Sequence, residues 1–479
     1  MFLDRAKEVA LRVKNSDFVR VITHIDTDGI SAGAVAKSAL DREGISNEII
    51  FIKNLGPGNV PEITKDLPEN GLIWFCDLGS GSLPELEGVP CVITDHHEPR
   101  YPQVSVPQEK RGDLLAFTKE VESKETSVLQ LNPHDFDIEG SNQISGAGVT
   151  FLVAKEMNDK NLDLSAFAVI GAVGDIQTPG NRLIGLNREI LETAVAQKLI
   201  KVETDIAYYG RETRDLVQIL AHASEPPIPT LSRNPNKVLD LYTQLGIELE
   251  REDGSYRHWT DLEPKEKKKI VSALMKLFLY HSHNPGRAKR IVGEVYIIRG
   301  ENKGSPLRDA KEFSTLLNSC GRYGHYDVAL DICLGNRGER LQEGLKLMWD
   351  HRANIMRFID VVKEVGVLKR EHFSYFYSTD RIPEEVVGII LGIMMSSGEV
   401  DRSKPVFAFA DSSDEGTLKV SARAARSLVE DGLDLSKVLK NSTARVGGSG
   451  GGHDVAAGGV VPRAGLDEFL DILEMELKA

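Results

Sequence analysis

The stretch His24-Ile25-Asp26-Thr27-Asp28-Gly29 separates two segments with different structural tendencies. The apolar run before it, Phe18 to Ile22, is typical of a buried strand, and the small residues after it predict a helix from Ser31 to Leu40. Ligands of α/β sheets bind in the crevice beyond the carboxyl ends of the strands. A strand that ends in alternating His, Asp and Asp therefore directs candidate metal ligands into that crevice.

Three further apolar runs end in a similar way. Leu72 to Cys76 leads into Asp77, and Cys91 to Thr94 leads into Asp95-His96-His97. Phe167 to Val173, which we also predict as a strand, leads through Gly174 into Asp175. One acidic strand end is ordinary loop chemistry, but four in succession predict a single metal site. Its expected ligands are His24, Asp26, Asp28, Asp77, His96 and Asp175.

Six ligands are more than one octahedral ion usually takes while leaving positions for water and substrate. Two ions that share a bridging carboxylate fit better, and such a pair, roughly 3.5 to 4 Å apart, suits phosphoester hydrolysis. Carboxylates favour Mg²⁺ and Mn²⁺, and imidazoles shift the preference towards Mn²⁺ or another transition metal such as Co²⁺. The sequence therefore predicts a two-metal phosphoesterase that prefers Mn²⁺.

Local signals predict several other elements. Polarity rises between Pro99 and Asn142, which suggests a surface excursion. Ser145-Gly146-Ala147-Gly148 opens a helix to about Met157, and its spacing is not that of a P-loop, so a phosphate cradle there is a weak alternative. Asp261 to Pro264 predicts the start of a helix from about Lys265 to Tyr280.

The metal-ligand stretches resemble the four motifs of the DHH phosphoesterase superfamily, in their usual order. Leu317 to Arg322 is similar to the asparagine-to-arginine motif of RecJ-type exonucleases. Glu385 to Ile390, Ser421 to Arg423 and Gly450 to His453 resemble the DHH-associated domain of the same proteins. The resemblance covers most of the chain except about residues 205 to 305, and archaeal RecJ-like nucleases of the GINS-associated kind fit best.

This resemblance implies an α/β protein built from several parts. We expect a DHH domain with a mainly parallel, doubly wound sheet at 1–204, an inserted α+β domain at 205–305, and a smaller α/β DHH-associated domain at 368–479. Residues 306–367 are expected to form the helical remainder of the DHH region and a connector. The insert resembles, by position, segments that contact proteins in archaeal RecJ-like proteins and their eukaryotic replicative-helicase relatives, so we expect it to bind a partner.

The expected division of roles centres on Asp77. His24, Asp26 and Asp77 are expected to hold one ion, and Asp28, Asp77, His96 and Asp175 the other, with Asp77 bridging. His97 is expected to stabilise the non-bridging phosphate oxygens as a catalytic residue alongside Asp77. Asp95 is expected to orient a histidine of its own motif. For any single Asp, helix capping is the plain alternative.

A second set of residues is expected to bind the substrate. Arg322 can grip backbone phosphates bidentately, and its alternative is an ordinary surface arginine. The run Gly447 to His453 lets backbone N–H groups approach an anion, and its alternative is a flexible linker. The residues expected to share that anion are Ser421, Arg423, Arg445, Gly450, Gly451, Gly452 and His453.

The resemblance implies an exonuclease in replication or repair that threads single-stranded DNA, and possibly RNA, between its two α/β domains and releases mononucleotides. Degradation runs 5′ to 3′ on DNA if the glycine-rich pocket binds a 5′ phosphate, as in bacterial RecJ relatives. One alternative is a phosphodiesterase of short oligonucleotides or cyclic dinucleotides, and another is a replisome scaffold with a helicase-associated role. A GINS-like replication protein is the expected partner.

Composition limits the other possibilities. The formal charge of −14 over 479 residues argues against a uniformly basic nucleic-acid glove, although a local groove can still bind nucleic acid. Cys76, Cys91, Cys320 and Cys333 show no CxxC spacing, which favours reduced, buried thiols. The charged start of the chain does not resemble a signal peptide, and the most apolar run is too short to span a bilayer. We therefore expect a cytoplasmic protein without membrane contact.

Overall fold

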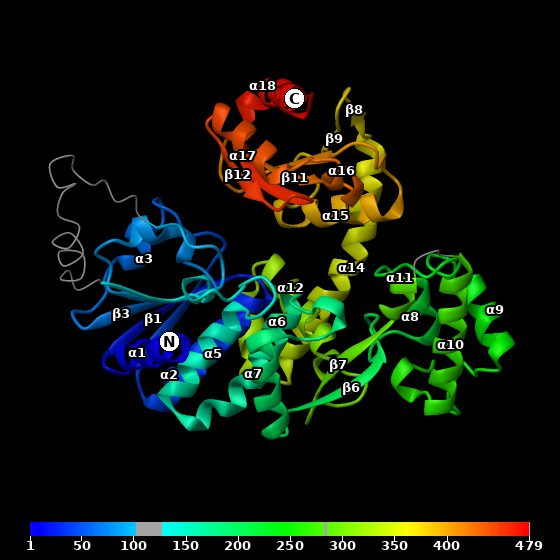
Figure 1. Cartoon of the computed structure of the whole chain (residues 1–479), viewed down its shortest axis with the longest axis horizontal. Helices are drawn as coiled ribbons and strands as arrows, with labels where there is room; N and C mark the ends of the chain where they lie inside the picture. The colour runs from blue at the N-terminus through cyan, green and yellow to red at the C-terminus, as the bar shows by residue number, and fades with distance from the viewer. Residues whose placement is uncertain (102–126, 282–284, 479) are drawn as a thin grey trace. The chain divides into compact units, whose positions relative to one another are not determined.

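The computed structural model describes residues 1–101, 127–281 and 285–478 (Figure 1). The chain divides into two compact units, Met1–Leu347 and Met348–Ala479. Each unit has its own sheet and its own apolar core, so each is described by itself.

The first unit is built on a parallel sheet of five strands. The strands are β1 (Phe18–His24), β2 (Ser46–Ile52), β3 (Gly71–Cys76), β4 (Cys91–Thr94) and β5 (Val128–Leu131). Their order is β2-β1-β3-β4-β5, and every neighbouring pair is parallel. The chain leaves β1 towards β2 on one side and returns as β3 on the other, which creates a topological switch point beyond the carboxyl ends of β1 and β3.

The three strands predicted nearest the ligand motifs, β1, β3 and β4, are confirmed. The fifth strand, β5, lies in the region expected to be a surface excursion, so that prediction is wrong for Val128–Leu131. The rest of the excursion falls largely on residues 102–126, which are outside the described residues. Because β5 has only four residues, its apolar pattern was too short to separate from loop.

Helices cover one face of this sheet. They are α1 (Phe2–Lys14), α2 (Thr27–Glu43) and α5 (Gly146–Met157), which pack against one another and against the strands. On the other face, α3 (Val60–Thr64) and the 3₁₀ segment η1 (Ser80–Leu86) bury apolar side chains over Ile73, Phe75 and Ile93. The helix predicted from Ser31 begins four residues earlier, at Thr27, and the helix predicted to open at Ser145 is α5, with Ser145 as its N-cap.

The segment Phe167 to Val173, predicted as a strand, is instead the helix α6 (Ser165–Gly174). It packs against α2, α5, α7 (Gly185–Ala196) and α12 (Ala310–Arg322). A helix enclosed on most sides is apolar on most sides, so it lacks the 3.6-residue periodicity that separates a helix from a buried strand. Asp175 therefore follows a helix and not a strand.

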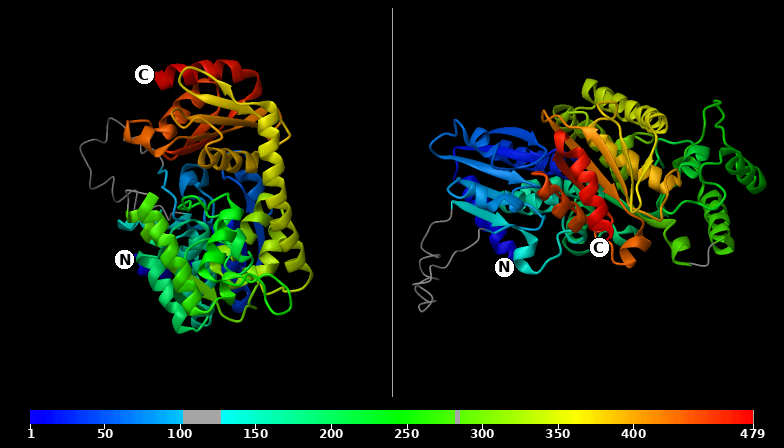
Figure 2. Two further views of the ribbon diagram at one scale, coloured as in Figure 1. Left: turned by 90° about the vertical axis from the view of Figure 1, so that its right-hand side faces the viewer. Right: turned by 90° about the horizontal axis from the view of Figure 1, so that it is seen from above.

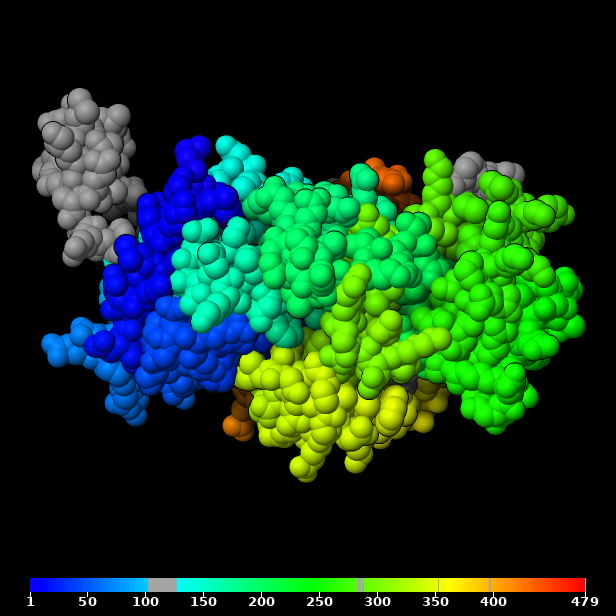
Figure 3. Space-filling view, turned by 90° about the horizontal axis from the view of Figure 1, so that it is seen from below, coloured from blue at the N-terminus to red at the C-terminus, as the bar shows by residue number. Residues whose placement is uncertain are grey.

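A helical insert lies between the two strands of an antiparallel ribbon, β6 (Ile200–Ile206) and β7 (Val292–Ile298). Its own core includes the fully buried Tyr242 and Trp259, whose polar atoms donate to Leu216 O and Asp205 Oδ1, both at 2.8 Å. In the space-filling view of Figure 3, the insert is the green region. Its helices are α8 (Leu216–Ala221), α9 (Pro235–Leu245), α10 (Pro264–His281, as predicted) and α11 (Pro285–Lys289).

The predicted helices after residue 307 are confirmed as α12, α13 (Tyr326–Cys333) and α14 (Glu339–Val365). A buried ionic network fixes α12 to the start of the insert. Arg211 pairs with Asp205 and with Asp309, both at 2.9 Å, and Glu312 accepts from the backbone N–H of Glu212 at 2.8 Å. Because α12 also contacts α2 and α6, it joins the insert to the helices around the sheet.

The second unit contains a six-stranded mixed sheet in the order β12-β13-β11-β10-β9-β8. Apolar residues of α14 and α15 cover one face, and α17 and α18 cover the other; Figure 2 shows the sheet between α15 and α18. Phe373 packs in the core of the second face, and the partly buried Tyr375 and Tyr377 pack against that core. The elements are β8 (Leu368–Lys369), β9 (Ser374–Tyr377), α15 (Glu384–Ser397), β10 (Val406–Asp411), β11 (Thr417–Arg423), α16 (Arg426–Glu430), α17 (Leu435–Arg445), β12 (Ser449–Gly452), β13 (Ala456–Pro462) and α18 (Leu466–Lys478).

All four cysteines are buried and unpaired, as expected. Within the described ranges, no helix combines the length and the apolar character needed to cross a bilayer.

Candidate metal centre

The centre is built around Asp77, which follows β3 at the switch point of the sheet. Its backbone has a φ of +60°, and its N–H donates to Thr94 O at 2.9 Å, so neighbouring strands hold this unusual conformation. The residue is only 1% exposed, yet neither carboxylate oxygen has a hydrogen-bond partner among the described residues. A buried carboxylate is costly without a compensating charge, so Asp77 is a candidate ligand for a cation.

On one side of Asp77 lie His24 and Asp26. His24 Nδ1 is 3.1 Å from Asp26 Oδ2 and 3.7 Å from Asp77 Oδ2, and the three residues form one potential metal-binding group. Asp26 is also the N-cap of α2, because its Oδ1 accepts from the Gly29 N–H at 3.0 Å. Its second oxygen remains directed towards His24.

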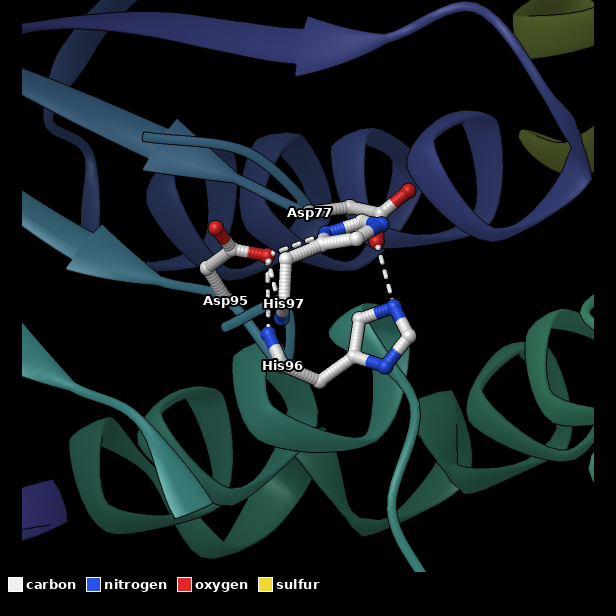
Figure 4. Close-up of side chains that lie close together, drawn as sticks. All are labelled: Asp77, Asp95, His96 and His97. Carbon is white, nitrogen blue, oxygen red and sulfur yellow. Dashed lines mark hydrogen bonds and ion pairs between the residues drawn. The ribbon is translucent and has the colours of Figure 1, made fainter. Parts of the chain in front are cut away.

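On the other side of Asp77 lie Asp28, His96 and Asp175, which form a second potential metal-binding group. His96 Nε2 is 3.3 Å from Asp77 Oδ1, 3.8 Å from Asp28 Oδ2 and 3.7 Å from Asp175 Oδ2. Figure 4 shows His96 directed at the Asp77 carboxylate. The two oxygens of Asp77 thus face different groups, which is the arrangement of a bridging ligand.

The Asp28 carboxylate is held by the N-terminus of α5. The backbone N–H of Gly146 donates to one oxygen at 2.6 Å and that of Ala147 to the other at 3.1 Å. The sequence offered these N–H groups as a weak alternative site for a phosphate. In the fold they donate to the Asp28 carboxylate instead.

A chain of amides orients the second group. His96 Nδ1 lies 2.8 Å from Gly140 O, which leaves Nε2 to face the carboxylates. Gln177 donates to Gly140 O and to Asp175 Oδ2, both at 2.8 Å, and Asn187 donates to Gln177 Oε1 at 2.7 Å. Gln177 is fully buried, so its hydrogen bond holds the Asp175 carboxylate in one position.

Asp95 supports its own motif. It accepts from the N–H groups of Ser80 and His96, at 2.9 and 2.8 Å, and from His97 Nδ1 at 2.8 Å. With Nδ1 bonded to Asp95, the His97 side chain is still 56% exposed, and it falls in a further potential metal-binding group with Asp77, Asp95 and His96 (Figure 4). His97 is therefore the member of this motif that is accessible to a substrate.

The pKa shifts show how strongly these groups interact. Burial opposes the charged forms of His24 and His96, but the surrounding carboxylates outweigh it and raise both pKa values well above the usual range. Burial together with Asp77 and Asp175 raises the pKa of Asp28 well above its usual value, and burial, opposed in part by His96, raises the pKa of Asp175 to about 6. These shifts reflect the close packing of several carboxylates with two imidazoles.

The donor set fits divalent cations. Four carboxylates and two imidazoles supply the oxygen and nitrogen ligands that Mn²⁺ accepts, and Asp77 has free oxygens towards both groups. Two glycines leave room for this packing. A Cβ on Gly146 would lie 2.3 Å from Asp77 Oδ1, and one on Gly171 would lie 2.3 Å from Asp28 Oδ1.

The helix α12 lies against the His24–Gly29 stretch. Asn318 Oδ1 accepts from the Thr27 N–H at 3.0 Å, and Thr27 Oγ1 donates to Ser314 O at 2.6 Å. Gly321 is so close to Ile25 O that an added Cβ would lie 2.0 Å from it. This packing brings Arg322, at the end of α12, near Asp26; burial lowers the pKa of Arg322, and the charge of Asp26 opposes that effect.

The residues predicted in the second unit form no single cluster. Ser421 and Arg423 alternate with the residues of β11 that face α17 and α18, and they lie on the α15 side, where a Cβ on Gly388 would be 3.0 Å from Ser421 Oγ. Arg445 ends α17 on the opposite face and pairs with Glu476 of α18 at 3.4 Å. The expected grouping of Arg445 with Ser421 and Arg423 is therefore wrong.

The glycine-rich run is neither a linker nor a loop of converging amides. Gly450, Gly451 and Gly452 belong to β12, the edge strand that pairs with β13, and His453 follows it in a turn closed by its N–H bond to Ala456 O at 2.8 Å. Glycines have no side chains that would indicate a strand, so the sequence suggested a loop. Pairing with β13 fixes the backbone of these residues as a strand.

The fold and the site define a RecJ-like member of the DHH superfamily. Residues 208–292 match the DHH-CID domain and residues 373–479 match the DHHA1 domain. The chain is 31% identical over 456 residues to the uncharacterized protein MJ0831 of Methanocaldococcus jannaschii, and the match covers 95% of this chain and 91% of that protein. The chain therefore belongs to one family with that protein, and its DHH-CID and DHHA1 domains support a place in the DHH superfamily.

Solved structures share the fold at low sequence identity. RecJ of Thermus thermophilus in complex with Mn²⁺ has a TM-score of 0.57 and 16% identity; the match covers all of this chain, which spans only 54% of that RecJ. CDC45 of Entamoeba histolytica has a TM-score of 0.62 and 12% identity, with 100% and 99% of the two chains covered. An exonuclease RecJ bound to manganese has a TM-score of 0.54 and 17% identity, with 100% and 94% covered.

Proposed function

We propose that the protein is a metal-dependent exonuclease that hydrolyses single-stranded nucleic acid to mononucleotides, in the 5′ to 3′ direction on DNA. The observation that carries the proposal is Asp77, a buried carboxylate with two unpartnered oxygens, each directed at a separate group of ligands. Such a bridge suits two divalent cations, with Mn²⁺ preferred and Mg²⁺ or Co²⁺ as substitutes.

The residues of the centre divide the work. His24, Asp26 and Asp77 would hold one cation, and Asp28, Asp77, His96 and Asp175 the other. When bound, the pair lowers the pKa of a water molecule and neutralises charge on the phosphate. Gln177 and the N-terminus of α5 keep the carboxylates of Asp175 and Asp28 in place, so the ligands need little rearrangement.

His97 is suited to stabilise the negative charge that develops on the phosphate. Burial opposes its charged form, but Asp95 outweighs this and raises the pKa of His97, which favours the protonated imidazole. Because Nδ1 is bonded to Asp95, Nε2–H is free to donate to a non-bridging oxygen. Arg322, close to Asp26, would hold a neighbouring phosphate of the same strand.

The choice of polymer rests on the two RecJ structures that share the fold, both with bound manganese and one of them an exonuclease. The CDC45 neighbour has the same fold, and the insert matches the DHH-CID domain, which supports a replication role in which the insert contacts a GINS-like protein. The centre retains a full ligand set, so we place catalysis ahead of a purely structural role.

The test is product analysis with Mn²⁺ on single-stranded DNA and RNA labelled at either end. We compare the wild type with Asp77→Asn, which removes the bridging charge at constant size, and with Asp159→Asn, a matched change at an exposed position of the same unit. Wild type and Asp159→Asn should release mononucleotides progressively from one end, and Asp77→Asn should be inactive. Cleavage of only di- or trinucleotides would favour a short-substrate phosphodiesterase, and no turnover by wild type would favour a scaffold.

A further inference from the structure

Ile176, between Asp175 and Gln177, combines two features that an aliphatic residue rarely shows together. Its backbone has a φ of +60°, and its side chain is 82% exposed. Among the described residues it is the only aliphatic one with a positive φ. A β-branched side chain is strained in this left-handed region, and strained residues gather at functional sites.

The strain arises from the way α6 ends. Asp175 is the C-cap, the N–H of Ile176 bonds to Val173 O at 3.2 Å, and the N–H of Gln177 bonds to Ala172 O at 2.9 Å. These two bonds make a Schellman motif, in which Ile176 has the position that glycine normally takes. The local backbone therefore favours glycine here, and the isoleucine side chain needs another explanation.

The side chain projects from a rigid support. Gln177 is fully buried and bonded to Asp175, Gly140 and Asn187, so the backbone on the C-terminal side of Ile176 is fixed. Ile176 directly follows Asp175, whose carboxylate belongs to the candidate metal centre, so its backbone lies beside a residue of that centre. Any nucleotide whose phosphate reaches that carboxylate brings its sugar and base into the same region.

We propose that Ile176 is a substrate-contacting residue that packs against the apolar face of the base next to the scissile phosphate. This inference rests on the proposed nuclease function and adds to it a contact that is independent of base identity, because every base has an apolar face. The residue would favour nucleotides over phosphodiesters that lack a base, without discriminating among sequences.

The chain offers a closely matched control for the strain. Lys198, after α7, has a φ of +59°, is exposed, and occupies the same position of a second Schellman motif, with N–H bonds from Lys198 to Val195 O and from Leu199 to Ala194 O, both at 2.9 Å. Replacing either residue by glycine relieves the same backbone strain. Both Ile176→Gly and Lys198→Gly should therefore raise the melting temperature, by about 2 °C.

Activity separates the two variants. The substrates are a strand of ten thymidylates and a strand of ten abasic deoxyribose phosphates, both with Mn²⁺. Ile176→Gly should lower kcat/KM on the thymidylate strand by about 10-fold and change the abasic strand by less than about 2-fold. Lys198→Gly should change neither, and Ile176→Leu, which keeps an apolar side chain, should retain activity on both.

Three results would overturn the inference. Equal losses of Ile176→Gly on both strands would mean that the residue only positions Asp175. Unchanged kcat/KM on the thymidylate strand would mean that no base is contacted, and a lower melting temperature would mean that the side chain packs on the protein. If the wild type cuts neither strand, the proposed nuclease function itself fails, which is a distinct outcome.

Discussion

Gly146→Ala tests the proposed bridging geometry of Asp77 without changing any proposed ligand. The added methyl group would lie 2.3 Å from Asp77 Oδ1 and 2.7 Å from Asp77 Cγ, whereas ordinary contacts begin at 3.4 Å. The carboxylate must therefore move by about 1 Å, and a displacement of that size costs on the order of 100-fold in rate. The overpacking itself should destabilise the fold by only about 1–3 kcal/mol.

Gly33→Ala is the matched control. Its methyl group would lie 2.8 Å from Ile49 Cδ1 and 3.0 Å from Thr23 Cγ2, so it is also crowded, though less closely, and only by apolar atoms. We would measure kcat/KM on end-labelled single-stranded DNA, Mn²⁺ affinity by calorimetry and stability by urea unfolding. Comparable stability of the two variants with activities within about threefold of each other would refute the bridging role of Asp77.

Three further predictions concern the supports of the centre. Gln177→Leu removes the amide that holds Asp175 and should weaken Mn²⁺ binding about 10- to 100-fold in calorimetry, with Asn142→Leu, a half-buried amide bonded to Glu139, as the control. Mn²⁺ affinity should rise with pH between about 5 and 8. The pKa of Asp175 is raised to about 6, so Mn²⁺ binding should displace a proton. Calorimetry of Mn²⁺ binding in two buffers of different ionisation enthalpy measures the protons released. Burial raises the pKa of Glu312 to about 7, so its folded state binds an extra proton and stability should fall as pH rises from about 4.5 to 7; Glu312→Gln should flatten that slope in urea unfolding at several pH values.

The part of the site carried by strands could be predicted from the sequence. A buried strand has a recognisable apolar run and a sharp end, and in a parallel sheet all carboxyl ends meet at one edge. His24, Asp77 and His96 were therefore brought together correctly from local patterns alone. Their bridging and metal-binding roles remain predictions.

Other parts depend on tertiary surroundings that no local pattern reports. The run before Asp175 is apolar because helices enclose it, so a helix and a strand would look alike in sequence. Gln177 and Asn187 are ordinary polar residues until the fold buries them behind Asp175. The separation of Arg445 from Ser421 follows from which face of the sheet α17 covers, and nothing in either stretch encodes that choice.

The centre is arranged for cation binding at the expense of local stability. Asp77 and Ile176 have strained backbones, and the pKa of Asp28 is raised because Asp77 and Asp175 are forced close to it. These features oppose folding in the absence of a cation, and the buried Gln177 and the N-terminus of α5 hold the groups together in spite of them. A cation that bound the folded state would relieve this repulsion, so the proposed metal binding and folding would be thermodynamically linked. Rigid strand and helix ends suit such a centre, because a flexible loop would relax the repulsion by moving the carboxylates apart.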